Sequence, residues 1–387
     1  MVQDEKKKNA GIWAKLLGLF LFLIISLNAA IWITGCTYVY KALVYTYPDT
    51  DDIDIFDVRS ISAKNPRPWP LSHSYNKYAL PASTLAKLEE LDSEAFLVIR
   101  EDSLIYEQYW DQLKENTVSN SFSVAKSIVG LLVGIAQEEK LFSIEDPVSR
   151  YLPSFSEGRN AELRIQDLLT MSSGLNWDES YSSLFSKTTE AYYGSNLRKL
   201  VKELKVIEIP GTRFSYMSCN TLILGMIIEK ASGQNLSAYA AEKLWTPLGA
   251  EYPAFWSLDK TEGVEKSYCC YYSTARDFAR IGKLIQDSGV WYGKRIVSSE
   301  FIKASLSPHG IPDESGNKTD YYGYHWWMLD HKGHKIAYAR GILGQYIVAV
   351  PERKLIFVRL GNKRGEKVLP NHYDDMINYL DGVLDTF

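Results

Sequence analysis

The chain contains the stretch Ser121-Phe-Ser-Val-Ala-Lys-Ser-Ile-Val-Gly130, which predicts the start of an apolar helix. Ser123 and Lys126 are three residues apart, so a helix that begins near Ser123 brings both side chains to one face. A serine hydroxyl is a poor nucleophile until a base takes its proton, and a nearby amine can be that base. Short Ser-x-x-Lys patterns also occur at ordinary helix starts. The pair therefore predicts a nucleophile and its base only if further motifs accompany it.

Length and composition limit the classes of protein to consider. A chain of 387 residues is long enough for one large domain or two ordinary ones. Its apolar content of 46% and charged content of 23% are near globular averages, so disorder is not indicated. The net charge of -4 gives no reason to expect nucleic acid as a partner.

The cysteines and histidines give no metal-binding pattern. Cys269 and Cys270 are adjacent, and we expect them not to pair with each other. No Cys-x-x-Cys or His-Glu-x-x-His spacing occurs, so we predict no metal site. Cys219 is interpreted as a small buried residue rather than a nucleophile.

The amino-terminal end predicts a membrane helix. A basic tail over residues 1–15 precedes an uncharged stretch from Leu16 to Tyr40, which is long enough to cross a bilayer. Four aspartates follow within residues 49–54. The charge pattern predicts a cytoplasmic amino terminus and a catalytic domain on the periplasmic, extracytoplasmic side.

Three interpretations of this segment remain open. Residues 16–40 fit a retained transmembrane signal anchor. The sequence Ile33-Thr-Gly-Cys36 also resembles a lipoprotein cleavage box, in which Cys36 would carry the lipid. A secretory signal that is simply cleaved is the third interpretation. All three export the catalytic domain.

The remaining chain predicts a linker and one domain of mixed α/β class. Residues 41–74 are rich in Pro, Asp and Tyr and lack periodicity, so they are predicted to be a linker before a domain over 75–387. Strand patterns occur at both ends of that domain, in residues 96–110 and 335–360. A helical insert over roughly residues 150–255 separates these strands. Two further helices are predicted, over 81–91 and 372–384.

A second reactive motif occurs in Pro210-Gly-Thr-Arg-Phe-Ser-Tyr-Met-Ser-Cys-Asn-Thr-Leu-Ile-Leu-Gly225. It places Tyr216 and Ser218 on a turn before a helix. A tyrosinate beside a lysine ammonium can move protons between a nucleophile and a leaving group. Four further motif-like stretches accompany these two motifs. One, at 168–181, precedes the second motif, and three follow it, at 274–282, 289–297 and 341–345.

In this order the motifs resemble those of the serine β-lactamase-related family, which includes class C β-lactamases, penicillin-binding DD-peptidases, esterases and 6-aminohexanoate-dimer hydrolases. The details are most similar to the 6-aminohexanoate-dimer hydrolase branch: Trp177-Asp-Glu-Ser-Tyr181, the Tyr-x-Ser motif, and Gly323-Tyr-His-Trp-Trp327. The resemblance covers about residue 75 to the carboxyl end. It implies a β-lactamase/transpeptidase-like α+β fold, an antiparallel sheet flanked by helices with an all-helical insert.

The resemblance also implies roles for individual residues. Ser123 matches the acylated nucleophile, Lys126 the lysine that takes its proton, and Tyr216 the tyrosine that acts as acid toward the leaving group. The backbone N–H groups of Ser123 and Ile342 would form the oxyanion hole. Ser218 stands where the family usually has Asn, and it is expected to bind substrate more weakly.

The third motif departs from the family pattern. The family shows Lys-Thr-Gly or His-x-Gly, whereas this chain has Ala339-Arg340-Gly341, without a cation at the first position. Arg340 could supply charge, although neighbouring strand positions point to opposite faces. We count Gly341 and Arg340 as substrate-binding candidates, and Trp177 and Tyr181 as candidates for a pocket wall.

Together these observations predict a membrane-anchored serine hydrolase that acts on linear amides or small esters, without a metal or an organic cofactor. One alternative is a penicillin-binding DD-peptidase or β-lactamase that acts on peptidoglycan or β-lactams. A second is a catalytically silent ligand-binding domain. The sequence does not specify the physiological substrate or the oligomeric state.

Overall fold

The computed structural model describes residues 2–111, 113–369 and 371–387. Its helices are α1 Val2–Thr34, α2 Tyr38–Tyr45, α3 Ala82–Glu90, α4 Val124–Glu138, α5 Ile165–Leu169, α6 Lys187–Tyr193, α7 Leu197–Lys202, α8 Ser218–Ser232, α9 Leu236–Ala240, α10 Ala275–Gln286, α11 Ser299–Ser305 and α12 Asp374–Thr386. Its strands are β1 Val58–Ile61, β2 Ser93–Arg100, β3 Ser103–Tyr109, β4 Ser119–Asn120, β5 Ala254–Ser257, β6 Tyr271–Ser273, β7 Val290–Trp291, β8 Lys294–Arg295, β9 Trp327–His331, β10 His334–Gly341, β11 Gln345–Val350, β12 Leu355–Gly361, β13 Lys367–Leu369 and β14 His372–Tyr373.

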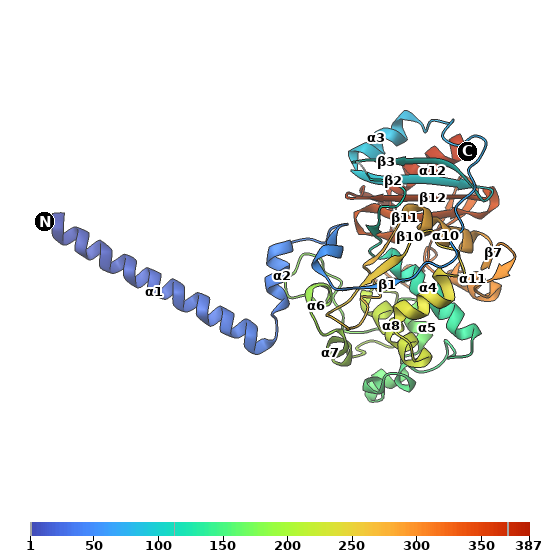
Figure 1. Ribbon diagram of the computed structural model, residues 1–387. Coiled ribbons are helices and arrows are strands. Elements are labelled where there is room, and N and C mark those ends of the chain that lie inside the picture. Colours follow the sequence, from blue (N-terminus) through green and yellow to red (C-terminus); the bar gives the residue numbers. More distant parts are fainter. Residues whose placement is uncertain (1, 112, 370) are drawn as a thin grey trace.

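A six-stranded antiparallel sheet joins the two ends of the domain, in the order β3-β2-β12-β11-β10-β9 (Figure 1). The pairing of β2 with β12 places Ile99 opposite Ile356, so an early strand lies beside a late one. The predicted sheet, with strands from both ends of the domain, is therefore confirmed.

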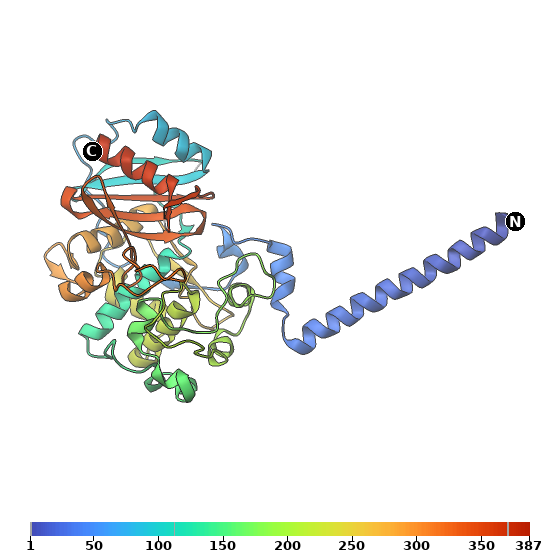
Figure 2. The ribbon, with the colours of Figure 1, turned by 180° about the vertical axis from the view of Figure 1, so that it is seen from behind.

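Alternating residues of the sheet divide between two cores because successive side chains in a strand point to opposite faces. Phe96 and Val98 pack toward α12, which covers one face together with α3 (Figure 2). Leu97 and Ile99 face the other core, which holds α4 and α10. The nucleophile helix α4 is thus fixed against the sheet on one side and against α8 on the other.

The helices α5 to α9 lie within residues 165–240, inside the range of the predicted helical insert. Of these, α5 to α8 lie below the six-stranded sheet in Figure 1, and α9 contacts β1. A second antiparallel sheet, in the order β1-β5-β6-β4, lies beside the start of α4.

The segment that we predicted as a linker, 41–74, instead packs onto the domain. β1 pairs with β5, with Arg59 opposite Trp256. Ile61 is fully buried, and the Trp69 indole donates a hydrogen bond to the Arg276 carbonyl at 2.8 Å. The linker prediction is wrong here because local composition gives no signal for a strand whose partner, β5, lies far along the chain.

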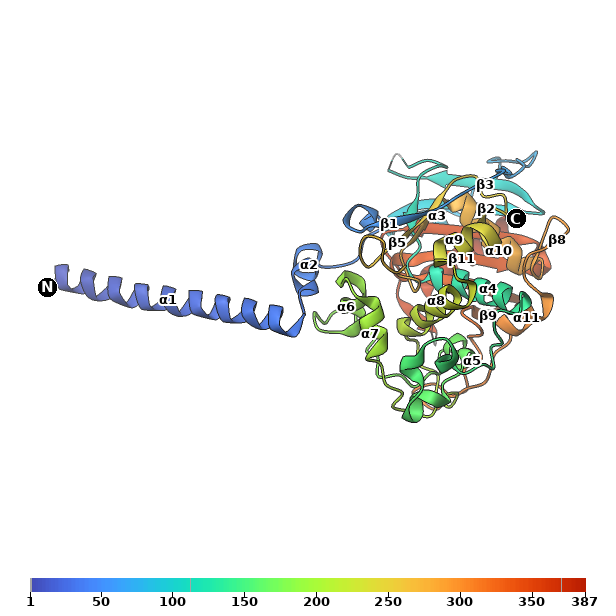
Figure 3. The same ribbon diagram turned by 60° about the horizontal axis from the view of Figure 1, so that its bottom comes forward.

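The amino-terminal helix α1 extends away from the domain (Figures 1 and 3). Asn9–Thr34 has the length and hydropathy needed to cross a membrane, and none of its most apolar window is buried. The helix ends at Thr34 rather than Tyr40, because Gly35 takes a left-handed φ of +76°. After three residues α2 begins, and it lies beside α6.

Two buried histidines give a testable dependence of stability on pH. Burial lowers the pKa of His325 to about 3, with the Lys126 charge as a smaller cause. Burial lowers the pKa of His372 to about 4, with the Arg340 charge as a smaller cause. The unfolded chain therefore binds more protons than the folded chain below about pH 6.5, so stability falls as the pH decreases from that value.

We expect the His372→Gln variant to weaken this dependence by about 1.4 kcal/mol for each pH unit between about 6.5 and 4. The Gln amide oxygen can still accept the hydrogen bond that the Tyr338 hydroxyl shares with His372 Nδ1 at 2.6 Å. Urea unfolding of both proteins in detergent, at a series of pH values, measures the difference. Equal pH slopes for variant and wild type would contradict the assignment.

Candidate active site

The nucleophile candidate lies at a strained turn between β4 and α4. Asn120 in β4 accepts a hydrogen bond from Phe122 N at 3.0 Å, and Ser121 N donates to the Tyr271 carbonyl at 2.9 Å. Phe122 has a φ of +43°, which is costly for a bulky residue. The turn places Ser123 directly before the first residue of α4 and leaves its side chain partly exposed.

Lys126 meets Ser123 as the spacing predicted. Its Nζ donates hydrogen bonds to Ser123 Oγ and to the Tyr268 carbonyl, both at 2.9 Å. The Lys126 side chain is buried, with 1% exposure. Two hydrogen bonds from opposite sides hold the amine against the hydroxyl, which is the geometry that proton removal from Ser123 requires.

Tyr216 completes the predicted cluster. Its ring centre lies 5.1 Å from Lys126 Nζ, and the ring packs against Trp327 with the two ring centres 5.6 Å apart. Tyr216 is half-buried at the turn before α8 and packs against the edge of the core that holds Trp327. The structure thus brings Ser123, Lys126 and Tyr216 together from α4 and the turn before α8.

A carboxylate that sequence reasoning missed, Glu179, links the segment 177–181 to Ser218. Glu179 accepts hydrogen bonds from Trp177 Nε1 and Ser218 N at 2.7 Å, and from the Ser218 and Tyr181 hydroxyls at 2.6 Å. Trp177 and Tyr181, predicted as wall residues, are therefore tied to Ser218 through one side chain. Four donors converge on the two oxygens of Glu179.

We expect Glu179→Gln to lower kcat/KM about tenfold and the free energy of unfolding by about 1–3 kcal/mol. The amide offers one acceptor atom where the carboxylate has two, so donors at Trp177 or Ser218 lose their partner. Kinetics and thermal unfolding measure the two effects. Glu203→Gln, on an exposed side chain whose ion pair with Lys199 spans 3.8 Å, is the control and should change neither quantity.

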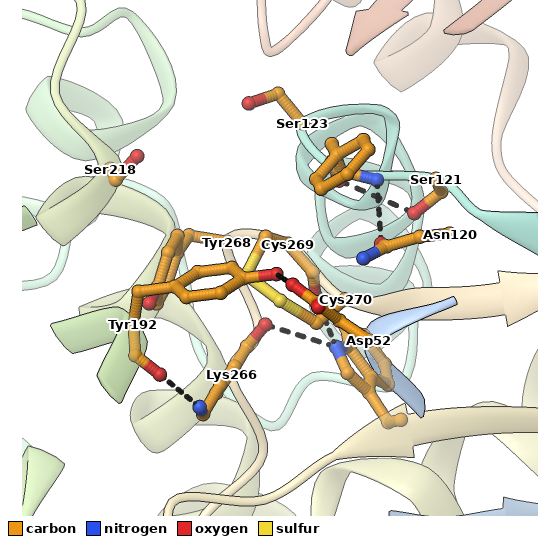
Figure 4. Close-up of a disulfide and its surroundings, with 12 residues drawn as sticks. Asp52, Asn120, Ser121, Ser123, Tyr192, Ser218, Lys266, Tyr268, Cys269 and Cys270 are labelled. Atoms are coloured by element: carbon orange, nitrogen blue, oxygen red, sulfur yellow. Dashed lines mark hydrogen bonds between the residues drawn. A yellow bond between two sulfur atoms is a disulfide. The ribbon is translucent and has the colours of Figure 1, made fainter. Parts of the chain in front are cut away.

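Cys269 and Cys270 form a disulfide, which corrects our prediction that they do not pair. We expected adjacent side chains to point apart, but Cys270 has a left-handed φ of +62°, which interrupts the alternation. Figure 4 shows the bridge next to Tyr268, with Ser123 and Ser218 on one side and Lys266 on the other. The bridged turn therefore carries the carbonyl that binds Lys126. Cys219 is buried as predicted, and burial raises its pKa well above the usual value, so it stays a thiol.

The third motif lies at the end of β10, a strand that contacts α4. Ala339 is fully buried in the core that holds α4. Arg340 points to the other face, where its guanidinium lies 3.6 Å from the centre of the Trp327 ring and donates to the Asn371 carbonyl. Arg340 therefore stacks on the ring that packs against Tyr216, and it does not line the cavity beside Ser123.

Gly341 sets the spacing between β10 and the nucleophile turn. A Cβ atom at this position would lie 2.4 Å from the Ser121 carbonyl oxygen, so the strand or the turn would have to move. We expect Gly341→Ala to lower kcat/KM about 100-fold, because displacements near 1 Å have effects of that size. Gly130→Ala is the matched control, since its Cβ would make only an ordinary 3.4 Å contact. Steady-state kinetics distinguish the two variants, and similar rates would contradict the proposed spacing.

A cavity of about 70 Å³ opens beside Ser123. Ser218, Tyr181 and Ile342 contribute to its lining, whereas Trp177 and Arg340 lie outside it. No charged side chain occurs among the described residues that line it. Ile342 begins the short η6 turn, Ile342–Gly344, after β10, so the backbone predicted for the oxyanion hole borders the same space as the nucleophile. Within the described ranges, no three His, Cys, Asp or Glu side chains are grouped to hold a metal ion.

Comparison with known proteins agrees with this arrangement. Residues 83–377 match the Beta-lactamase family model. The chain is 27% identical over 292 residues to the 6-aminohexanoate-dimer hydrolase of Paenarthrobacter ureafaciens, covering 71% of this chain and 74% of that protein.

Two solved structures show the shared fold. A Bacillus anthracis protein assigned as a 6-aminohexanoate-dimer hydrolase has a TM-score of 0.74 at 21% identity, covering 89% of this chain and 93% of that one. A class C beta-lactamase has a TM-score of 0.58 at 17% identity, covering 78% and 92%. From the family match and the serine–lysine geometry together, we conclude that the chain belongs to the Beta-lactamase family, whose fold carries serine hydrolases.

Proposed function

We propose that this protein is a membrane-anchored, extracytoplasmic serine hydrolase that cleaves linear amides or small esters. The observation that carries the proposal is the 2.9 Å hydrogen bond between Lys126 Nζ and Ser123 Oγ at the edge of an uncharged cavity. A buried amine beside a partly exposed hydroxyl is the arrangement that nucleophilic catalysis needs.

The reaction follows from these positions. Lys126 takes the Ser123 proton as Oγ attacks the substrate carbonyl, and the backbone N–H groups of Ser123 and Ile342 stabilise the oxyanion. The bond from the acyl carbon to the leaving nitrogen or oxygen then breaks, and Tyr216 with Lys126 supplies the proton that the leaving group takes. Water attacks the acyl-enzyme, which releases the acid and restores the Ser123 hydroxyl.

Two observations support the extracytoplasmic location. Asn9–Thr34 is apolar enough to cross a membrane, with a basic tail before it and aspartates after it. The Cys269–Cys270 disulfide is favoured in an oxidising compartment.

The substrate class is supported by the site and by the relatives. Ala339 stands where the family has the cation that would bind a substrate carboxylate, and Arg340 is absent from the cavity lining. The Paenarthrobacter relative is a 6-aminohexanoate-dimer hydrolase, which favours a linear amide over a β-lactam.

A substrate panel tests the proposal. Wild type and Ser123→Ala are compared on p-nitrophenyl esters, linear amides and β-lactams, with intact-mass detection of an acyl-enzyme. We expect Ser123-dependent hydrolysis of esters or linear amides. Strong labelling by a fluorescent penicillin at Ser123, without ester or amide turnover, would instead favour a penicillin-binding function. A protein that neither turns over these substrates nor reacts with a fluorophosphonate would refute the enzyme proposal.

A further inference from the structure

Part of the lining of the active-site cavity comes from the segment that follows the apolar amino-terminal helix. Ala42 and Thr46 of α2 and its end, with Pro48 after it, line the same cavity as Ser123. Residues 181–184 and residues of α6 line the same cavity. The substrate site is therefore built jointly from the catalytic domain and from residues next to α1.

The connection between α1 and α2 is short. Four Cα steps separate Thr34 from Tyr38, which limits their distance to about 15 Å. The Tyr40 hydroxyl also donates a hydrogen bond to Asn28 Oδ1 at 2.6 Å, so α2 folds back beside the last turns of α1. If α1 spans the bilayer, as proposed above, α2 and the cavity must lie at the membrane surface.

The outer side of α2 is apolar. Tyr38, Val39 and Ala42 turn toward the domain and are buried, whereas Leu43 and Val44 are 57% and 73% exposed. Phe185, which directly follows the lining residues 181–184, is 70% exposed. Beyond residue 40, half of the exposed large apolar side chains of the described chain lie on α2, the turn after it and the 181–185 loop: Leu43, Val44, Tyr45, Tyr47, Tyr181 and Phe185. An exposed apolar patch next to a membrane helix is typical of an interfacial surface.

The cavity itself selects for an uncharged group. Its described lining contains hydroxyl, aromatic and aliphatic side chains and no charged one. Its volume of about 70 Å³ holds a few water molecules, far less than the roughly 300–1,000 Å³ of a ligand pocket. A longer acyl group must therefore extend beyond the cavity, and α2 and the 181–184 loop, which both contribute to the lining, adjoin the exposed apolar side chains of Leu43, Val44 and Phe185.

We propose that the natural substrate is an ester or amide of a membrane amphiphile, whose acyl chain enters from the bilayer surface between α2 and the 181–185 loop. This inference rests on the proposed serine hydrolase and on its membrane anchor, and it specifies their substrate. The acyl carbonyl reaches Ser123, and the apolar chain lies along Leu43, Val44 and Phe185.

The test uses the full chain in phosphatidylcholine vesicles with p-nitrophenyl butyrate and p-nitrophenyl decanoate. Each buried methylene contributes up to about 0.8 kcal/mol, so we expect kcat/KM to favour the decanoate by about tenfold or more. The double variant Leu43→Glu/Val44→Glu should reduce that preference about tenfold while butyrate hydrolysis stays within about twofold of wild type. Phe185→Asp, in the 181–185 loop, should act in the same direction.

Leu71→Glu is the matched control. Leu71 is 60% exposed but lies beside Leu104 of β3, in the sheet part of the domain, and it does not line the cavity. All variants face the same vesicles, so substrate partitioning is common to them. The inference is overturned if the double variant and Phe185→Asp leave the preference unchanged, or if they lower both substrates equally. Absence of Ser123-dependent butyrate hydrolysis would instead refute the proposed function itself.

Discussion

Ser123→Ala is expected to lower kcat/KM for ester substrates by about 10⁴-fold or more and to abolish the acyl-enzyme. Without Oγ no covalent intermediate forms, and only binding and the backbone donors of the oxyanion hole remain, which leaves a small rate above that in water. Ser123 is partly exposed at the helix start, so its hydroxyl contributes little to packing. Kinetics and intact-mass spectrometry after mixing with substrate measure both effects.

Ser127→Ala is a fold control on the next turn of α4. Its hydroxyl donates to the His325 carbonyl at 2.6 Å, away from Lys126, so its loss should lower stability without removing the acyl-enzyme. If Ser123→Ala kept an acyl adduct on another residue, the assignment of the nucleophile would be wrong.

Lys126→Met is expected to lower kcat/KM by about 10³-fold or more. The thioether matches the length of the lysine stem but cannot take the Ser123 proton or donate to the Tyr268 carbonyl. The variant removes a buried amine but leaves the Tyr268 carbonyl without its donor, and because these two effects oppose each other the thermal unfolding midpoint should stay near that of wild type. A fall in kcat/KM without a fall in the unfolding midpoint would show that Lys126 acts in catalysis rather than in packing.

Lys283→Met provides the contrast, because this lysine is also buried, with 2% exposure, but is paired with Asp102 and Asp287. Removing it leaves partly buried carboxylates without their cation, so stability should fall while kcat/KM changes little. A large rate loss in Lys283→Met, or none in Lys126→Met, would contradict the proposed base.

The parts of the site that could be predicted from sequence are those set by local geometry. Ser123 and Lys126 meet because helical periodicity places residues three apart on one face. Arg340 turns away from Ala339 because strand positions alternate. These relations depend only on residues close in sequence.

The parts that were missed depend on contacts between distant residues or on unusual backbone angles. Glu179 reaches Ser218 from a loop of irregular conformation, and a single Glu after a Trp gives no periodic signal. β1 was missed because its partner strand, β5, lies far along the chain. The Cys269–Cys270 bridge depends on a left-handed backbone at Cys270, which composition does not reveal.

The pair of β1 with β5 cannot form until most of the helical part has been synthesised. The strand Val58–Ile61 comes early in the chain, whereas its partner, Ala254–Ser257, follows the helices α4 to α9. Closing so long a loop is slow, since non-local pairing must wait for chain entropy to be overcome. Throughout that interval β1 remains without its partner strand and open to proteases or chaperones. The six-stranded sheet closes later still, because β2 pairs with β12, Leu355–Gly361.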